Sequence, residues 1–345
     1  MNIRLRPLRE QSVVLLGASS GIGRETALQF ARRGARVLVA ARSATNLESL
    51  VREIRSRGGV AVAAPCDASR FDEVQRLAQT ALSEFGAFDT WVNLAAVSLY
   101  ARFEDTTPEE FRRIMEVNLM GQVHGAQAAL PHLKNRGGAL IFVSSVEARR
   151  ALPYQSAYAA SKHAIKGMVE ALRMELEYDR HPVSVTEILP ASIDTPFFNQ
   201  ARSKLGVEAR GVPPVYPPSA VARAILYAAA HPVREIPVGS AARAIITGEK
   251  LSPALMDRLL RPTFESQRTD RPAPTRDNLF EPNESIDTTT GTQGHRPFSA
   301  YTWLKTNPTV AGAIAMGLLG AVAASAVNRA RSSRERPAGG RNPAW

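Results

Sequence analysis

Short apolar runs alternate with helix-length amphipathic segments over about the first 245 residues of the chain. The runs, which we expect to form β-strands, lie at 13–16, 36–40, 60–63, 90–93, 139–143, 183–188 and 235–238. Apolar strands without clean alternation, separated by helices, are typical of a parallel sheet covered on both faces. The pattern therefore predicts an α/β fold with a doubly wound parallel sheet, a Rossmann fold, in a single domain over residues 8–250.

Helical periodicity fills the segments between these runs. We expect helices at 44–57, 71–84, 108–133 and 157–178, and a further helix that begins near Ile22. Such alternation of strand and helix is the pattern from which βαβ units are recognised.

The chain changes character after the predicted domain. Residues 251–305 are rich in Pro and polar residues and lack sustained periodicity, so we expect an extension or linker that is solvated and loosely ordered. Residues 306–328 are predicted to form an apolar helix, and residues 329–345 form a basic tail.

The uncharged run at 310–327 is eighteen residues long, which is near the minimum for a membrane-spanning helix. Its many small residues weaken that interpretation, and the arginines after it place the tail on the same side as a cytoplasmic domain. Three hypotheses stay open: a tail anchor, a helix that lies on an anionic membrane surface, and a helix used for self-association.

Composition and charge limit the possible partners. Of the net charge of +11, residues 1–200 carry +3 and residues 201–345 carry +8, and 37 of the 43 basic residues are Arg. Aromatic residues are 6% of the chain and no nucleic-acid-binding module is evident, so we expect no nucleic-acid partner. The single cysteine, Cys66, excludes an intrachain disulfide, which agrees with a cytoplasmic location for the domain.

A glycine-rich turn, Gly17-Ala-Ser-Ser-Gly-Ile-Gly23, connects the first predicted strand to the first predicted helix. Glycines at this place let the backbone approach a pyrophosphate at the helix N-terminus, where N–H groups and the helix dipole attract anions. A glycine-rich turn without a ligand is the alternative. The strand before it and the helix after it favour a dinucleotide site that includes Gly17, Ser19, Ser20, Gly21, Ile22 and Gly23.

The second predicted strand is followed by Arg42 and has no acidic residue at its end. An acid there usually binds the ribose of NAD, whereas an Arg accommodates the 2′-phosphate of NADP. Because the chain is rich in Arg, a solvated surface Arg is a serious alternative. We expect NADP(H), with NAD as the second possibility.

Tyr158 and Lys162 are four residues apart on a predicted helix, with Ser145 upstream. Residues at this spacing project from one face of a helix. A nearby ammonium lowers the pKa of a tyrosine, and a tyrosine tuned in this way can exchange a proton with an alcohol or carbonyl oxygen. The pair alone is common by chance, so its weight comes from the dinucleotide motif upstream.

Taken together, these motifs resemble the short-chain dehydrogenase/reductase family over residues 8 to about 245. The resemblance rests on Gly17, Gly21, Gly23, Asp67, Asn93, Asn118, Ser145, Tyr158, Lys162, Pro190, Ile193 and Thr195. The chain departs from the family pattern at Leu16, Leu94, Ala96 and Ala191, none of which is a catalytic position.

The resemblance implies a role for each matched residue. Tyr158 is the general acid/base, Lys162 lowers its pKa and binds the nicotinamide ribose, and Ser145 donates to the substrate oxygen. Asn118 holds a water for proton relay. The cofactor is bound in addition by Asp67, at the adenine, and by Asn93, Pro190, Ile193 and Thr195.

The expected function is interconversion of a secondary alcohol and a carbonyl. The resemblance implies that residues 197–200 and the segment through 213–218 form a substrate lid, whose apolar and aromatic content suggests an apolar substrate. A Pro-rich surface loop is the equally good alternative for this segment. No metal site is expected. The family resemblance also implies a homo-oligomer. The alternatives are a sugar-nucleotide epimerase or dehydratase, and a membrane-tethered cofactor-binding scaffold without turnover.

Overall fold

A computed structural model describes residues 3–296 and 298–313 of the chain. Seven strands form its central sheet: β1 (Ser12–Leu16), β2 (Arg36–Ala41), β3 (Val60–Pro65), β4 (Thr90–Asn93), β6 (Gly138–Val143), β7 (Val183–Pro190) and β10 (Glu235–Val238). Their order is β10-β7-β6-β4-β1-β2-β3, and every neighbouring pair is parallel. The predicted doubly wound parallel sheet is therefore confirmed.

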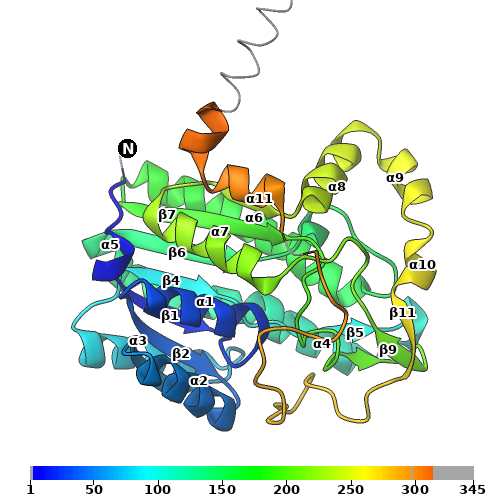
Figure 1. Ribbon diagram of the computed structural model, residues 1–345, viewed down its shortest axis with the longest axis horizontal. Coiled ribbons are helices and arrows are strands. Elements are labelled where there is room, and N and C mark those ends of the chain that lie inside the picture. The colour runs from blue at the N-terminus through cyan, green and yellow to red at the C-terminus, as the bar shows by residue number, and fades with distance from the viewer. Residues whose placement is uncertain (1–2, 297, 314–345) are drawn as a thin grey trace, which may run out of the picture. The chain divides into compact units, whose positions relative to one another are not determined.

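Helices cover both faces of this sheet (Figure 1). One face packs against α1 (Gly21–Arg32), α2 (Ala44–Ser56) and α7 (Pro218–Ala230), and the other against α3 (Phe71–Phe85), α5 (Gly121–Arg136) and α6 (Ser156–Tyr178). Successive side chains of a strand point to opposite faces, so Val13 and Leu15 belong to the first core and Val14 and Leu16 to the second. Both cores are apolar because both faces of the sheet are buried.

The long helix predicted at 108–133 is interrupted in the structure. It begins as α4 (Pro108–Met115), passes through a π-helical turn, η3 (Glu116–Met120), and continues as α5. The N-terminus of α4 is fixed by a capping box between Thr107 and Glu110. Periodicity alone did not predict the π-helical turn, and such turns are frequent at functional sites.

Shorter elements lie outside the central sheet. The strands are β5 (Leu99–Tyr100), which pairs with β8 (Arg202–Ser203), and β9 (Val207–Ala209), which pairs with β11 (Arg268–Pro272). The helices are η1 (Leu8–Glu10), η2 (Phe103–Asp105), η4 (Val146–Ala148), α8 (Ser240–Leu251), α9 (Pro253–Leu259), α10 (Thr263–Ser266) and α11 (Ala300–Lys305).

The C-terminal extension differs from the loosely ordered arm that we expected. Residues up to Thr302 belong to one compact unit with the sheet, and β11 pairs with β9 inside it. Farther along, Leu279 is fully buried, and the backbone of residues 278–288 accepts hydrogen bonds from α1 and α2. Because the segment is bound mainly through its backbone groups, no periodic apolar pattern revealed the contact.

A second compact unit comprises Trp303–Trp345, of which only residues 303–313 are described. Most of the apolar run at 310–327, and the whole basic tail, lie outside the described residues. Within the part that is described, no helix has the length and apolar character needed to cross a membrane.

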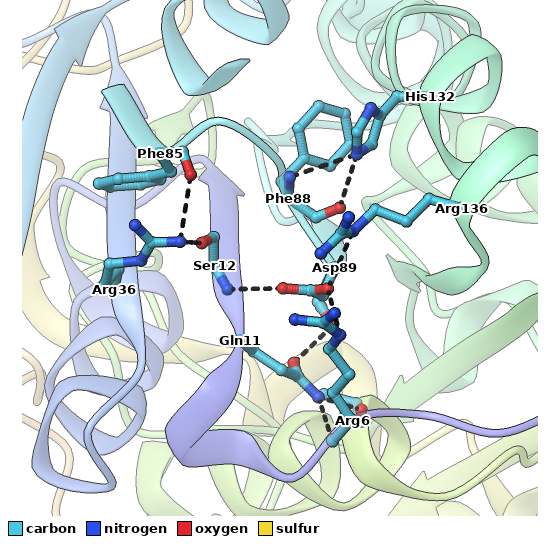
Figure 2. A network of polar contacts seen from close by, with 11 residues as sticks. Arg6, Gln11, Ser12, Arg36, Phe85, Phe88, Asp89, His132 and Arg136 are labelled. Carbon is cyan, nitrogen blue, oxygen red and sulfur yellow. Dashed lines mark hydrogen bonds and ion pairs between the residues drawn. The ribbon is translucent and has the colours of Figure 1, made fainter. Parts of the chain in front are cut away.

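A polar network closes the amino ends of β1 and β4, at the sheet edge opposite the motifs (Figure 2). Asp89 accepts a hydrogen bond from the Ser12 amide at 2.9 Å, and its other oxygen lies 3.4 Å from Arg6 and 3.5 Å from Arg136. Gln11 donates to the carbonyl oxygen of Ala229 at 2.7 Å. The network joins the N-terminal segment to two strands and to α7.

Candidate active site

The candidate site lies at the carboxyl ends of β1 and β4, which are neighbours in the sheet although β2 and β3 separate them in the sequence. In doubly wound folds, ligands bind at such a point of reversed strand order. The Gly17 amide donates to the Ala40 carbonyl at 2.7 Å, and the Leu94 amide donates to the Leu16 carbonyl at 2.8 Å. These bonds fix the two loops that line a cavity of about 240 Å³.

The glycine-rich turn forms one wall of this cavity and leads into the first turn of α1. A Cβ atom on Gly23 would lie 2.0 Å from the Gly17 carbonyl oxygen, so no larger residue fits there without moving the turn. Amides of the first helical turn have no acceptor within their own helix. The glycine-rich turn and the first turn of α1 together form a cradle, and this cradle fits the pyrophosphate of a dinucleotide.

Almost all the residues predicted to bind the cofactor line this one cavity. They are Gly17, Ser19, Ser20, Gly21, Ile22, Gly23, Arg42, Asp67, Tyr158, Lys162, Pro190, Ile193 and Thr195. The sequence motifs that are far apart in the chain thus converge on a single groove.

Asn93 is the exception among the predicted cofactor residues, because it does not line the cavity. Its Oδ1 accepts a hydrogen bond from the Trp91 indole at 3.0 Å, and a Cβ atom on Gly125 would lie 1.9 Å from the same oxygen. The side chain thus packs beneath α5. The expectation that it contacts the cofactor does not agree with this geometry.

Arg42 and Asp67 line the cavity at the ends of β2 and β3. The Arg42 guanidinium donates to the backbone carbonyls of Phe280 at 2.7 Å and of Asn278 at 2.5 Å. Asp67 accepts hydrogen bonds from Ser69 and forms an ion pair with Arg113 at 3.2 Å, and these contacts hold its pKa below the usual value although burial opposes them. The bonds between Arg42 and the extension were not predicted.

Ser145 and Tyr158 meet at the other end of the cavity. Ser145 begins η4 and accepts a hydrogen bond from the Glu147 amide at 3.1 Å, while Tyr158 lies in the first turn of α6. Both side chains line the cavity, and the Ser145 hydroxyl acts to lower the pKa of Tyr158. Ser144 also lines the cavity, but it has no such effect on Tyr158.

Lys162 is buried one helical turn after Tyr158. Its ammonium donates to the Val143 carbonyl at 3.3 Å and lies 5.3 Å from the centre of the Tyr158 ring. Burial lowers the pKa of Lys162 to about 8, against the opposing charges of Glu187 and Glu147.

The pKa of Tyr158 is raised, whereas the sequence pattern predicted that Lys162 would lower it. Burial is the largest cause and the negative charge of Glu147 adds to it, while the hydrogen bond from Ser145 acts in the opposite direction. The spacing of Tyr158 and Lys162 showed that they share a helix face, but it gave no information on burial or on Glu147.

Asn118 lies in the π-helical turn and does not line the cavity. Its Oδ1 accepts from the Val97 amide at 2.8 Å, and its Nδ2 donates to the Val97 carbonyl at 3.0 Å and to Ser161 at 3.2 Å. The Ser161 hydroxyl in turn donates to the Tyr158 carbonyl at 2.6 Å. The side chain of Asn118 thus joins the loop after β4 to α6, and its role in holding a water stays a prediction.

Beyond Tyr158 the cavity wall is mainly apolar and aromatic. It includes Tyr100, Leu152, Phe197, Phe198 and Val212, and the rings of Phe197 and Tyr158 lie 5.7 Å apart between centroids. The extension completes this wall through Gln267, which accepts a hydrogen bond from Gln155 at 2.9 Å. The apolar character expected from residues 197–200 is therefore present in the wall.

Glu147 is a site residue that the motifs did not reveal. It lines the cavity, is 5% exposed, and accepts a hydrogen bond from the Leu152 amide at 3.4 Å. Burial raises its pKa to about 8, and among the described residues no Lys or Arg forms an ion pair with it. In the sequence, only its position two residues after Ser145 could have indicated that Glu147 belongs to the site.

Comparison with known proteins identifies the family. The model of the short chain dehydrogenase family matches residues 11–206. The uncharacterized oxidoreductase YxnA of Bacillus subtilis (strain 168) is 41% identical over 329 residues, which cover 93% of this chain and 92% of that protein. The chain belongs to the short-chain dehydrogenase family.

Other relatives of this short-chain dehydrogenase cover less of it. The dehydrogenase/reductase SDR family member 7B of Bos taurus is 38% identical over 202 residues, which are 56% of this chain and 61% of that protein. A solved alcohol dehydrogenase from the archaeon Thermococcus sibiricus, complexed with 5-hydroxy-NADP, is 27% identical. It matches 66% of this chain and 95% of its own, with a TM-score of 0.59.

These findings make the protein an NAD(P)-dependent oxidoreductase that acts on CH–OH groups. The match to the Bacillus protein extends into the C-terminal extension, because an alignment over 93% of 345 residues must include residues 251–305. The extension is therefore shared with a relative of nearly the same length. Among the described residues no group of His, Cys, Asp and Glu is suited to hold a metal ion.

Proposed function

We propose that this short-chain dehydrogenase is an NADP(H)-dependent oxidoreductase that interconverts a secondary alcohol and a carbonyl. One observation carries the proposal: Ser145 and Tyr158 line the same cavity as the glycine-rich turn. A group that exchanges protons and a cradle for a dinucleotide thus open into one space. That combination is what redox chemistry at a C–O bond requires.

The residues have distinct proposed roles. Hydride transfer is the chemistry that a nicotinamide supplies when bound. Tyr158 gives a proton to the substrate oxygen as a carbonyl is reduced, and takes it back when an alcohol is oxidised. Ser145 donates a hydrogen bond to the same oxygen as negative charge develops on it. Lys162 binds the nicotinamide ribose, and Asn118 holds the start of α6 in place.

Tyr158 is protonated near neutral pH, because burial and the charge of Glu147 both raise its pKa. The protonated phenol is the form that donates to a carbonyl oxygen, so the assay follows carbonyl reduction with NADPH.

The preference for NADP(H) rests on Arg42. Its guanidinium lines the cavity beside the end of β2, where Ala40 and Ala41 precede it and the strand itself does not end in an acidic residue. Two of its N–H groups are used by backbone carbonyls, and a guanidinium has five, so donors are left for a phosphate. The 5-hydroxy-NADP in the archaeal alcohol dehydrogenase agrees with this assignment.

The proposed substrate has an apolar body. The aromatic residues Tyr100, Phe197 and Phe198 surround the space next to Tyr158, and burial of apolar surface there favours hydrophobic ketones or aldehydes. Glu147 and Gln155 add polar groups to the same space, and they suit a substrate with one hydrogen-bonding substituent.

The decisive experiment compares Tyr158→Phe with the wild type. NADPH oxidation is followed with a panel of hydrophobic ketones and aldehydes, and NADPH binding is measured separately by fluorescence. We expect turnover to fall by at least about 10²-fold in Tyr158→Phe, with the Kd for NADPH within about threefold of wild type. Tyr154→Phe is the matched control, because Tyr154 does not line the cavity and should keep its activity.

Three results would contradict the proposal. Normal activity in Tyr158→Phe would show that the proton comes from another group. Substrate conversion without net NADPH consumption would instead indicate an epimerase, and cofactor binding without any turnover across the panel would indicate a scaffold.

A further inference from the structure

Residues 277–295, here called the strap, run along the whole length of the cofactor groove. In Figure 1 the strap is part of the orange-gold chain between β11 and α11, and it passes beside the ends of α1 and α2. Three of its residues, Asn278, Pro282 and Asn283, line the cavity together with the glycine-rich turn. The strap therefore covers the groove and leaves a space beneath it.

At the adenosine end, the strap is bound to α2 and to Arg42, which lies between β2 and α2. Arg42 donates to the carbonyls of Phe280 and Asn278, and the Asn46 amide donates to the carbonyls of Asn283 at 3.1 Å and Ile286 at 3.0 Å. These two side chains thus hold four strap carbonyls.

A side-chain contact extends this attachment along α2. The Ser49 hydroxyl donates to the Asp287 carboxylate at 2.6 Å. Neither residue lines the cavity, so their contact holds the strap without facing the groove.

In the middle of the groove, the strap crosses the start of α1. The Gly21 amide donates to the Thr288 carbonyl at 2.8 Å. Gly21 is the first residue of α1, so this bond uses one N–H group of the helix N-terminus and leaves those of Ile22 and Gly23 directed at the groove.

At the nicotinamide end, the strap packs against the loop after β7. Asp194 accepts from the Gln293 amide at 3.3 Å and pairs with His295 at 2.9 Å. A Cβ atom on Gly291 would lie 2.6 Å from the Thr195 carbonyl oxygen, so the two chains are in close contact. Thr195 itself lines the cavity.

An apolar side chain anchors the strap near the catalytic helix. Leu279 is fully buried in a cluster with Val97, Ile114, Val117 and Ala157. The Arg113 guanidinium donates to the Leu279 carbonyl at 3.0 Å. The strap thus has a hydrophobic anchor as well as polar contacts at both ends.

We propose that the strap is part of the nicotinamide-dinucleotide site and retains the bound cofactor, so that the cofactor exchanges only when the strap opens. The inference rests on cofactor binding in the groove, as in the proposed function. Because the strap contacts the adenosine end, the glycine-rich turn and the nicotinamide loop, a dinucleotide that lies along the groove passes beneath it. Dissociation then requires several of these contacts to break together, which slows release.

The test measures the rate of NADPH release. Full-length protein is loaded with NADPH and mixed with excess NADP⁺ in a stopped-flow instrument, and the loss of bound NADPH fluorescence gives the dissociation rate. The strap variant combines Leu279→Ala and Asp287→Ala, because these residues anchor the strap but do not line the cavity. Glu284→Gln is the matched control, since it removes an exposed carboxylate from the strap for which no contact is described.

We expect the dissociation rate to rise at least tenfold in the strap variant and to stay within twofold of wild type in Glu284→Gln. An unchanged rate in the strap variant, with an unchanged thermal unfolding curve, would overturn the proposal. Tighter NADPH binding in the strap variant would also overturn it, because the strap would then compete with the cofactor. If the double variant fails to fold, Gly291→Ala provides the same test, since its methyl group displaces the strap from Thr195.

Limited trypsin digestion gives a readout that is independent of activity. Arg276 is exposed and immediately precedes the strap. NADPH should slow cleavage after Arg276 in the wild type and in Tyr158→Phe, but much less in the strap variant. Equal protection in all three proteins would contradict cofactor retention by the strap, whereas loss of turnover in Tyr158→Phe tests the proposed chemistry separately.

Discussion

The Lys162 ammonium lies 5.3 Å from the centre of the Tyr158 ring and donates a hydrogen bond to the Val143 carbonyl at the end of β6. The two side chains lie one helical turn apart on α6, and both line the cavity. Lys162 is thus placed between the end of a central strand and the tyrosine. We propose that Lys162 acts on the cofactor and that Tyr158 acts on the proton, so their effects can be measured separately.

Replacement of Lys162 should therefore affect two steps at once. We expect Lys162→Met to reduce kcat/KM by about 10²-fold or more and also to weaken NADPH binding, whereas Tyr158→Phe should reduce turnover alone. Steady-state kinetics and NADPH fluorescence titration measure the two effects. Lys166→Met is the control, because Lys166 lies on the same helix and pairs with Glu170 at the surface. Unchanged NADPH binding in Lys162→Met would contradict the proposed contact with the ribose.

Arg42 should determine the choice between the two nicotinamide cofactors. Arg42→Ala removes a charged donor from the groove, and a charge-assisted contact of about 1.5–3 kcal/mol corresponds to roughly tenfold or more in selectivity. We expect the ratio of kcat/KM with NADPH to kcat/KM with NADH to fall by at least that factor. Arg33→Ala, at the far end of α1, should leave the ratio unchanged. An equal loss with both cofactors would show that Arg42 only supports the strap.

Glu147 should make stability depend on pH. Its pKa is about 8 in the folded protein because burial disfavours the carboxylate, whereas an exposed Glu titrates near 4.5. Between these values the unfolded chain releases the proton and the folded protein keeps it. The free energy of unfolding therefore falls as pH rises through this window, by about 1.4 kcal/mol for each unit of pKa shift.

Glu147→Gln removes this dependence, because an amide does not titrate. We expect the stability of the variant relative to wild type to increase steadily from pH 5 to pH 8, as measured by urea denaturation at each pH. Glu104→Gln, at an exposed position, should show no such trend. A constant difference between Glu147→Gln and wild type across this range would mean that Glu147 is ionised throughout.

Asp89 should support the fold without affecting the site. Asp89→Ala leaves the buried Ser12 amide without its acceptor, which costs about 1–3 kcal/mol of unfolding free energy. Because the network in Figure 2 closes the amino ends of β1 and β4, the Kd for NADPH should not change. Asp72→Ala, which breaks an exposed pair with Arg76, should cost less than about 1 kcal/mol. A change in NADPH affinity of Asp89→Ala would show that the two sheet edges are coupled.

Some of the site is determined by local sequence alone. The strands are found from apolar runs because both faces of a parallel sheet are buried, as Val13 and Val14 illustrate by packing into opposite cores. Gly23 is required because a Cβ atom there would collide with the Gly17 carbonyl oxygen in the preceding turn, which is a local constraint. Tyr158 and Lys162 share a helix face through spacing alone. Each of these features depends on residues that are close in the chain.

Other features depend on contacts that only the tertiary structure brings together. The π-helical turn at Asn118 and the packing of Asn93 beneath α5 follow from how neighbouring elements fit, and no periodicity encodes them. The raised pKa of Tyr158 depends on burial and on Glu147, which belongs to another element. A local pattern cannot report the environment that distant residues create.

The strap shows this limit most clearly. Its composition is that of a solvated linker, and that is how the sequence alone describes it. In the structure its backbone carbonyls receive donors from Arg42, Asn46 and Gly21, more than 200 residues earlier in the chain. Backbone groups are the same in every residue, so a segment bound through them leaves no side-chain pattern. The sequence by itself determined the sheet, the glycine-rich turn and the spacing of Tyr158 and Lys162, and the tertiary structure decided that the extension lies along the groove that they line.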